Sequence, residues 1–167
     1  STIKTIMALA GLQDGKIAPD TKFKCLGHIQ VPQTYNELQR NRYWCWTRDQ
    51  SHQDLDVREA LATSCDVFFY NTAAPRQQDD LGNYTRYYQP GKAEPDYFQG
   101  LGIDKMNEYL RLCGFGALTG IELGDEVEGL VASPAWKEQT FPGDFWSIGD
   151  TINSSIGQGF MQVTPLQ

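Results

Sequence analysis

The segment 56–75 constrains the fold of this chain more than any other. Asp56 suits a helix N-cap, and Glu59 follows three residues later, as in a capping box. The helix that this pattern predicts is interrupted at Ser64-Cys65-Asp66, and a strongly apolar second helix begins at Val67. Ser64 and Asp66 are therefore expected at a helix–helix junction, where side chains can be directed into a cleft.

Other segments give weaker patterns. Apolar residues at helical spacing predict helices over 1–14, ended by Gly15, and over 103–112, ended by Gly114 and Gly116. Further expectations are short strands near Phe23, Ile29 and 121–123 (Ile121-Glu122-Leu123), a brief helix opened by Ser133-Pro134, a Gly-rich loop over 149–159 that leads to the last helix, and the start of that helix at Thr164-Pro165.

The composition suits a globular domain or a large piece of one, with 167 residues, 40% hydrophobic and 21% charged. It contains no apolar run long enough to span a membrane, and we expect no signal peptide among these residues. Both ends look like cuts, so we expect a fragment. A net charge of −7 argues against a nucleic-acid partner. The densest basic group, Arg40, Arg42 and Arg48, is interpreted as a solvated loop.

The four cysteines leave alternatives open. Cys25 and Cys45 lie in loop-rich sequence and could form a disulfide, bind zinc together with His52, or stay free thiols. Cys65 and Cys113 lie among apolar helical residues and are expected to be buried.

Residues 75–100 are interpreted as a loop insertion. The segment is rich in glutamine, aspartate, proline and tyrosine, and irregular loops of this length are uncommon. It could shape a substrate groove, although a surface excursion without function explains it better.

Ser1 and Lys4 are the first candidate catalytic pair, because positions i and i+3 share one face of a helix. A serine hydroxyl needs a neighbouring base to act as a nucleophile at neutral pH, and a neutral lysine amine can be that base. A helix that starts at the serine adds a positive local field. Alone, however, Ser-x-x-Lys is better explained as a helix cap followed by a solvated lysine, since a chain this long contains the pattern about once by chance.

Ser64 and Asp66 are the second candidates. A hydroxyl and an acceptor two residues apart could relay a proton and hold a substrate amide, although both residue types are common at helix junctions. The combination carries more weight. Penicillin-recognising enzymes have Ser-x-x-Lys, then a Ser-Asp-Asn-type element, then Lys-Thr-Gly, and here the first two occur in that order, about sixty residues apart.

The chain resembles class B penicillin-binding proteins of the elongation type, the penicillin-binding protein 2 family. The resemblance covers nearly the whole chain outside 75–100 and part of 28–53. Two departures stand out: Asp66 occupies a position that is Asn in many penicillin-recognising enzymes, and Lys-Thr-Gly is missing. The matching segments are Ser1-Thr2-Ile3-Lys4 with Ala8-Leu9-Ala10, Glu59-Ala60-Leu61, Ser64 to Tyr70, Gly102-Ile103-Asp104-Lys105, Gly114-Phe115-Gly116, Thr119-Gly120-Ile121, Gly149 to Asn153, Ser155 to Gly159 and Thr164-Pro165-Leu166-Gln167.

The resemblance implies an α+β fold, the penicillin-binding transpeptidase fold shared with serine β-lactamases, with this fragment mainly its helical lobe. Residues 1–167 would be a partial transpeptidase domain that begins at the Ser-x-x-Lys helix and ends before the Lys-Thr-Gly strand. We therefore expect less than about a quarter of the residues in strands.

The resemblance also implies a mechanism for the intact protein, a peptidoglycan D,D-transpeptidase. Ser1 attacks the penultimate D-alanine carbonyl of a stem peptide, and Lys4 accepts the serine proton. Ser64 helps return that proton to the leaving amine, Asp66 positions the network, and both contact the substrate. β-Lactams would acylate Ser1 in the same way. No cofactor and no metal are implied, and the fragment alone is expected to be inactive.

Expected partners are stem peptides, β-lactam antibiotics and cell-wall elongation proteins. The intact protein is expected to be anchored at the outer face of the bacterial cytoplasmic membrane, in the cell envelope. Two rival interpretations stay open: a serine β-lactamase or D,D-carboxypeptidase, and a penicillin-sensing or scaffold module without turnover.

Overall fold

The computed structural model describes residues 2–33, 36–48, 50–74, 77–78, 84–86, 100–122 and 124–167. Its helices are α1 (Thr2–Gln13), α2 (Val57–Ala62), α3 (Asp66–Ala73), α4 (Gly102–Leu112), α5 (Pro134–Thr140) and α6 (Ile148–Ser154). Its strands are β1 (Phe23–Cys25), β2 (His28–Gln33), β3 (Asn36–Trp44), β4 (Gln53–Leu55), β5 (Gln77–Gln78) and β6 (Tyr84–Arg86).

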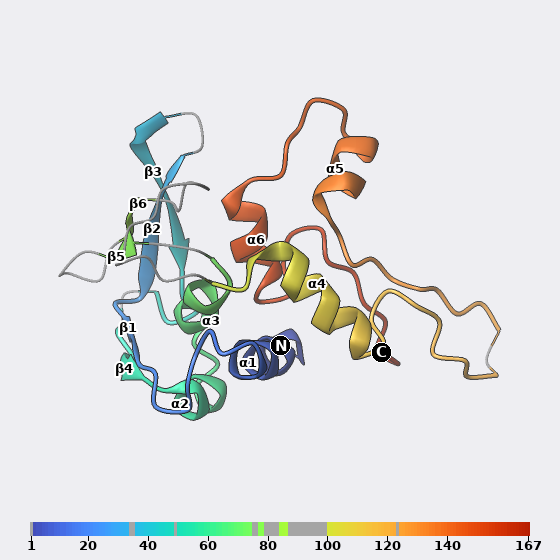
Figure 1. The fold of residues 1–167 in the computed structure, drawn as a ribbon, viewed down its shortest axis with the longest axis horizontal. Helices are drawn as coiled ribbons and strands as arrows, with labels where there is room; N and C mark the ends of the chain where they lie inside the picture. Colours follow the sequence, from blue (N-terminus) through green and yellow to red (C-terminus); the bar gives the residue numbers. More distant parts are fainter. Residues whose placement is uncertain are drawn as a thin grey trace.

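Helix α3 is the centre of the hydrophobic core, and α1, α4 and α6 surround it (Figure 1). All eight residues of α3 are buried, which agrees with the apolar and aromatic run from Val67 to Tyr70. Phe68 and Phe69 on α3 are almost fully buried with Met7 of α1 and Met106 of α4. Helices α1 and α3 approach closely at Gly11, where an added Cβ would lie 2.9 Å from a methyl carbon of Thr72.

The strands form three separate antiparallel pairs, β1–β4, β2–β3 and β5–β6. The β2–β3 hairpin rises beside α3, and β1–β4 lies near its base (Figure 1). Fewer than a quarter of the described residues are in strands, and helices hold more residues than strands do. The expected α+β composition, mainly helical, is therefore confirmed.

The helices predicted from local signals are confirmed. Asp56 caps α2 in a complete capping box with Glu59, and Ser133 caps α5 with Pro134 in its first turn. Helix α1 ends at Gln13, and Gly15 follows in the left-handed conformation with φ 64°.

Four expectations at other segments are wrong. Residues 149–159 are partly helical, because α6 begins at Ile148 and its N-cap Ser147 forms a capping box with Asp150. Ile121 and Glu122 lie outside any strand, Pro165 and Leu166 lie in a turn, and Arg40 and Arg42 belong to β3. Leu123 and most of 75–100 lie outside the described residues. The described parts of 75–100 include the short β5–β6 pair.

A buried lysine fixes the segment between α5 and α6. The amine of Lys137 forms ion pairs with Asp144 at 3.0 Å and Asp150 at 2.9 Å, and it donates a hydrogen bond to the carbonyl of Phe145. Burial acts to lower the pKa of Lys137, but the hydrogen bonds to Asp150 and Asp144 outweigh it and raise the pKa. The charged amine therefore links α5 to the start of α6.

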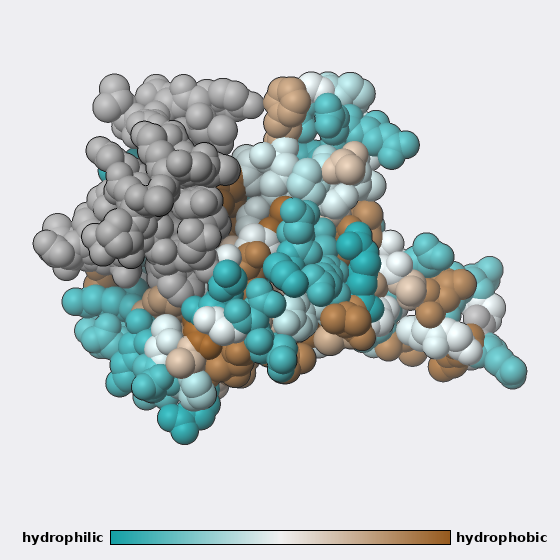
Figure 2. Space-filling view, viewed as in Figure 1, coloured by the Kyte–Doolittle hydropathy of each residue, from teal (hydrophilic) through white to brown (hydrophobic). Residues whose placement is uncertain are grey.

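Between α4 and α5 an arm, residues 117–122 and 124–128, extends away from the helices (Figure 1). It carries the exposed apolar side chains of Leu118, Ile121 and Val127, and Figure 2 shows apolar surface along it. The side-chain amide of Gln167 donates to both ends of the arm, at the carbonyls of residues 117 and 128. Among the described residues, no helix has both the length and the apolar character needed to cross a membrane.

Candidate active site

Lys4 brings the two predicted motifs together. It lies in the first turns of α1 with only 5% of its surface exposed. Its amine donates hydrogen bonds to the carbonyl oxygen of Ser64 at 2.8 Å, to the hydroxyl of Ser64 at 3.0 Å and to Oδ1 of Asp66 at 2.5 Å. These contacts join residues about sixty positions apart, as the two-motif prediction requires.

The junction between α2 and α3 presents Ser64 by an unusual backbone conformation. Ser64 has φ 53°, the left-handed region that residues other than glycine rarely adopt. The turn is closed by hydrogen bonds from the amide of Ser64 to Leu61 O and from the amide of Cys65 to Ala60 O. Such strain persists only where surrounding contacts determine it, and the bonds from the amine of Lys4 to the carbonyl and hydroxyl of Ser64 are among those contacts.

Both oxygens of Asp66 are occupied. Oδ1 accepts from Lys4, and Oδ2 accepts from the backbone amide of Trp46 at 2.8 Å. Asp66 is also the first residue of α3, where the helix dipole favours a negative charge. The indole of Trp46 donates to Thr63 O at 2.9 Å, so the turn after β3 is attached to both sides of the junction. The backbone contact to Trp46 has no signal in the sequence.

This arrangement can move a proton. An ammonium group has three N–H donors, and Lys4 has three acceptors within reach, so the charged form is fully satisfied. A neutral amine has two donors and one lone pair. It can keep Ser64 O and Asp66 as acceptors and accept a proton from a hydroxyl, which makes Lys4 and Ser64 a two-step relay.

Ser1, the predicted nucleophile, lies outside the described residues. The structure therefore describes Lys4, Ser64 and Asp66 of the four predicted catalytic residues, and it brings these three into direct contact.

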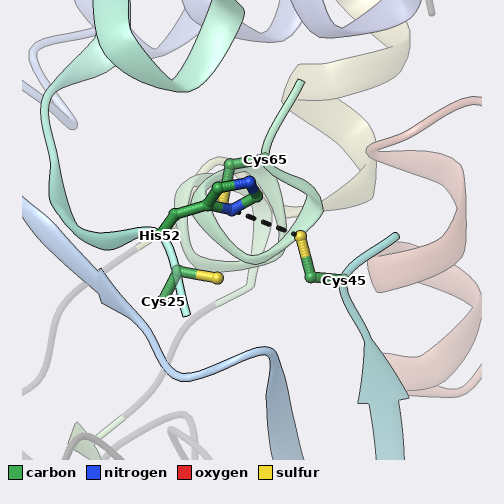
Figure 3. Close-up of side chains that lie close together, drawn as sticks. All are labelled: Cys25, Cys45, His52 and Cys65. Carbon is green, nitrogen blue, oxygen red and sulfur yellow. Dashed lines mark hydrogen bonds between the residues drawn. The ribbon is translucent and has the colours of Figure 1, made fainter. Parts of the chain in front are cut away.

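A second cluster lies behind the same junction. Cys25 ends β1, Cys45 follows β3, His52 precedes β4 and Cys65 is the N-cap of α3. Their four side chains point toward one another (Figure 3). The three sulfur atoms and one histidine nitrogen all lie within 4.8 Å of one another, and Sγ of Cys45 lies 3.7 Å from Nδ1 of His52. Three thiols and an imidazole match the ligand types of a four-coordinate zinc site.

The thiols influence one another's ionisation. Hydrogen bonds with Cys25 and Cys65 lower the pKa of the Cys45 thiol. The hydrogen bond with Cys45 raises the pKa of Cys25, burial adds to it, and the hydrogen bond with Cys65 acts against it. Hydrogen bonds with Cys25 and Cys45, together with burial, raise the pKa of Cys65. A lowered pKa at Cys45 favours its thiolate, the form that binds metals.

The structure decides among the alternatives for the cysteines only in part. Cys25 and Cys45 are not joined by a disulfide. Cys65 is buried as predicted, but its neighbours include the thiols of the cluster, which sequence spacing did not suggest. The prediction that Cys113 is buried is wrong: it follows the last turn of α4 and is exposed.

Comparison with known proteins finds relatives along the whole chain. The family model described as the penicillin-binding protein transpeptidase domain matches residues 1–167. Among curated proteins, peptidoglycan D,D-transpeptidase MrdA of Acinetobacter baumannii is 33% identical over 167 residues, all of this chain and 20% of that protein. The MrdA of Salmonella typhimurium is 34% identical over the same length, 22% of that protein.

Solved structures agree. PBP2 of Pseudomonas aeruginosa in complex with WCK 5153 superposes with a TM-score of 0.74 and 29% identity, covering 99% of this chain and 30% of that one. PBP2 of Helicobacter pylori in complex with MreC gives 0.73 and 26%, covering 100% and 25%. The chain spans about a fifth of the length of the curated relatives that it matches. The resemblance found in the motifs is confirmed, and the chain belongs to the penicillin-binding protein transpeptidase domain family.

Proposed function

We propose that this chain is the serine–lysine part of a peptidoglycan D,D-transpeptidase. In the intact protein Ser1 attacks the D-alanyl carbonyl of a stem peptide, Lys4 takes the serine proton, and Ser64 passes a proton to the leaving amine. The observation that carries the proposal is the buried amine of Lys4, held at once by Ser64 and Asp66. That geometry provides a base beside the start of α1, where the chain carries a serine.

Asp66 has a positioning role in this proposal. Its carboxylate pairs with the charged form of Lys4 through Oδ1. The backbone amide of Trp46 donates to Oδ2 and so fixes the orientation of the carboxylate. When Lys4 accepts the serine proton, the resulting ammonium is stabilised by a carboxylate already in place. This preorganised arrangement stabilises charge without further rearrangement.

The first test measures the mass of the undigested full-length protein after incubation with benzylpenicillin. A single penicilloyl adduct, lost in Ser1→Ala and retained in Ser51→Ala, is the expected result. Ser51 is a matched control, since it lies shortly before β4 and its hydroxyl donates to Cys25 O and not to Lys4. A folded intact protein that forms no adduct would contradict the catalytic proposal and favour a scaffold role.

A product assay separates the transpeptidase from its rivals. The protein is given a D-alanine-terminated stem peptide together with an amine acceptor. A cross-linked dimer is the expected product. Release of D-alanine without cross-linking would identify a carboxypeptidase, and rapid hydrolysis of the penicilloyl adduct would identify a β-lactamase.

The cellular location and the partner proteins of the intact protein are also part of the proposal. We place it in the cell envelope, anchored at the outer face of the cytoplasmic membrane and working with elongation proteins. Support comes from the relatives, which are named peptidoglycan transpeptidases, and from the Helicobacter pylori relative, which was solved in complex with MreC. Fractionation of cells followed by labelling with a fluorescent penicillin would test the location.

We propose a second function for the same chain, binding of one structural zinc ion by Cys25, Cys45, His52 and Cys65. The observation that favours it is the convergence of four soft or borderline ligands from four segments of the chain. Tetrahedral Zn²⁺ with Zn–S distances near 2.3 Å places sulfurs about 3.8 Å apart, so the side chains need only small rotations from their positions here. Such an ion would join β1, β3 and α3 where no disulfide does.

Metal analysis of the purified intact protein tests this second function. The expected result is about one zinc per chain, lost in Cys65→Ser and retained in Cys113→Ser. Cys113 is exposed and outside the cluster, so it controls for the loss of a thiol. Zinc below a tenth of an equivalent in protein purified without chelator would contradict the assignment.

A further inference from the structure

A pocket of about 460 Å³ lies beside the predicted active site. Its walls come from the end of β3 and the turn that follows it, from Asp66 and Tyr70 of α3, and from the end of α6 with the turn after it. Asp66 lines this pocket and also contacts Lys4, so the pocket adjoins the catalytic groups directly. Its volume lies in the range of ordinary ligand sites.

The charged groups in this pocket are mostly positive. Arg42 and Arg48 line it, and Asp66 is the acid among the lining residues. Both oxygens of Asp66 already accept hydrogen bonds, one from Lys4 and one from a backbone amide. The guanidinium groups of Arg42 and Arg48 therefore have no carboxylate partner among the residues that line the pocket. Neither arginine forms an ion pair within the described part of the chain, whereas Arg58 pairs with its own helix cap.

This positive surplus is local. The chain as a whole carries a net charge of −7, so an anion approaching most of its surface is repelled. The guanidinium of Arg42 lies over the ring of Trp44, 5.0 Å from its centroid. Stacking of this kind orients the group and leaves its N–H donors available for a carboxylate.

The wall that carries Arg48 is rigidly attached. The amide of Cys45 donates to Gly27 O, the amide of Arg48 donates to Cys45 O, and Trp46 is held through two hydrogen bonds to the junction between α2 and α3. Arg48 itself has φ 51°, in the left-handed region. A guanidinium on a turn fixed at this many points loses less entropy on binding than one on a free loop.

We propose that this pocket is a carboxylate-binding subsite that recognises a side-chain carboxylate of the peptide substrate, away from the bond that is cleaved. The inference rests on the proposed transpeptidase function. Guanidinium groups bind carboxylates through paired N–H donors, and the amides of Asn153 and Gln158 on the opposite wall add further donors. The exposed indole of Trp46 at the rim can cover the methylene groups that precede the carboxylate.

The test uses the intact protein and two synthetic D-alanine-terminated stem peptides that differ at one side-chain carboxylate, free in one and amidated in the other. The measured quantity is the ratio of kcat/KM for the two peptides, from release of D-alanine, repeated for each carboxylate of the stem. The wild type is expected to prefer the free acid at one position by about tenfold or more, mainly through KM.

Arg42→Gln and Arg48→Gln, singly and together, are expected to bring that ratio toward one without slowing reaction with the amidated peptide. Arg111→Gln is the matched control, because this exposed arginine lies on α4 away from the pocket. A ratio unchanged in the double variant, or an equal loss with both peptides, would overturn the subsite. Penicillin acylation separates the two proposals: if the wild type forms no adduct, the proposed function itself fails.

Discussion

Gly27→Ala is the change for which the structure gives the sharpest expectation. Gly27 lies between β1 and β2 with φ 85°, and its carbonyl accepts from the amide of Cys45. An added Cβ would lie 1.8 Å from the carbonyl oxygen of Arg48. Since real Cβ atoms stay beyond about 3.0 Å, the turn that carries Cys45 must move by roughly 1 Å.

A shift of this size is large on the scale of a metal site. Zinc–ligand distances are held to about ±0.2 Å, and Cys25 lies two residues before the altered glycine while Cys45 lies on the displaced turn. We expect the affinity of the cluster for zinc to fall at least about tenfold, with the left-handed alanine adding about 1–2 kcal/mol of strain.

The assay is titration of the metal-free intact protein with cobalt, followed by the absorption of the thiolate–cobalt bond, and then competition with zinc. Gly15→Ala is the matched control, since Gly15 also has a positive φ of 64° but nothing lies within 4 Å of an added Cβ. The control reports backbone strain alone. Wild-type affinity in a folded Gly27→Ala protein, or an equal loss in Gly15→Ala, would refute the reasoning.

Three further predictions concern the site and the core. Asp66→Asn offers one acceptor oxygen to two donors, so penicillin acylation should slow about tenfold, and an unchanged rate of adduct formation would contradict the positioning role. Lys137→Met leaves the carboxylate of Asp150 without its buried partner and should lower the free energy of unfolding by about 2 kcal/mol in urea titrations; a change under about 0.5 kcal/mol would show that the ion pair is dispensable. Met106→Ala should cost about 2–4 kcal/mol, whereas Leu112→Ala, 74% exposed on the same helix, should be nearly neutral, and equal effects would place the core elsewhere.

The helices that the sequence predicts well are those with signals close together in the chain. The capping box at Asp56 and the Ser133-Pro134 start each depend on a few adjacent residues, and both are present as expected. Helix α6 was missed because Gly149, Asn153 and Ser154 are poor helix formers. Its capping box and burial override that propensity, and the Ser147-x-x-Asp150 spacing was the signal that could have revealed it.

Strand β3 was missed for a different reason. Its amide- and arginine-rich sequence shows no alternation of apolar and polar residues, and the strand is defined by pairing with β2. A strand stabilised by its partner and exposed over much of its length gives little signal of its own. Ile121 and Glu122 show the reverse case, since no strand in the described part of the chain pairs with them and they stay irregular.

The part of the candidate site that the sequence predicts is the part defined by two short motifs in a fixed order, Ser-x-x-Lys followed by Ser-x-Asp. Lys4, Ser64 and Asp66 follow from motif types and order, and the structure brings the three into contact, while their catalytic roles stay a prediction. The cluster behind them was only partly foreseen. The sequence groups Cys25, Cys45 and His52 as one alternative, but Cys65 joins them through the packing of α3, which depends on the tertiary fold.

The turn at residues 64–66 directs consecutive side chains to opposite sides. Ser64 and Asp66 face Lys4, and Cys65 faces the thiol cluster. Under the proposed function, this coupling narrows the substitutions that can give antibiotic resistance. A substitution that reshapes the turn to exclude a β-lactam would also displace a ligand of the proposed zinc ion, so resistant variants should arise at positions outside the turn and its hydrogen-bond partners.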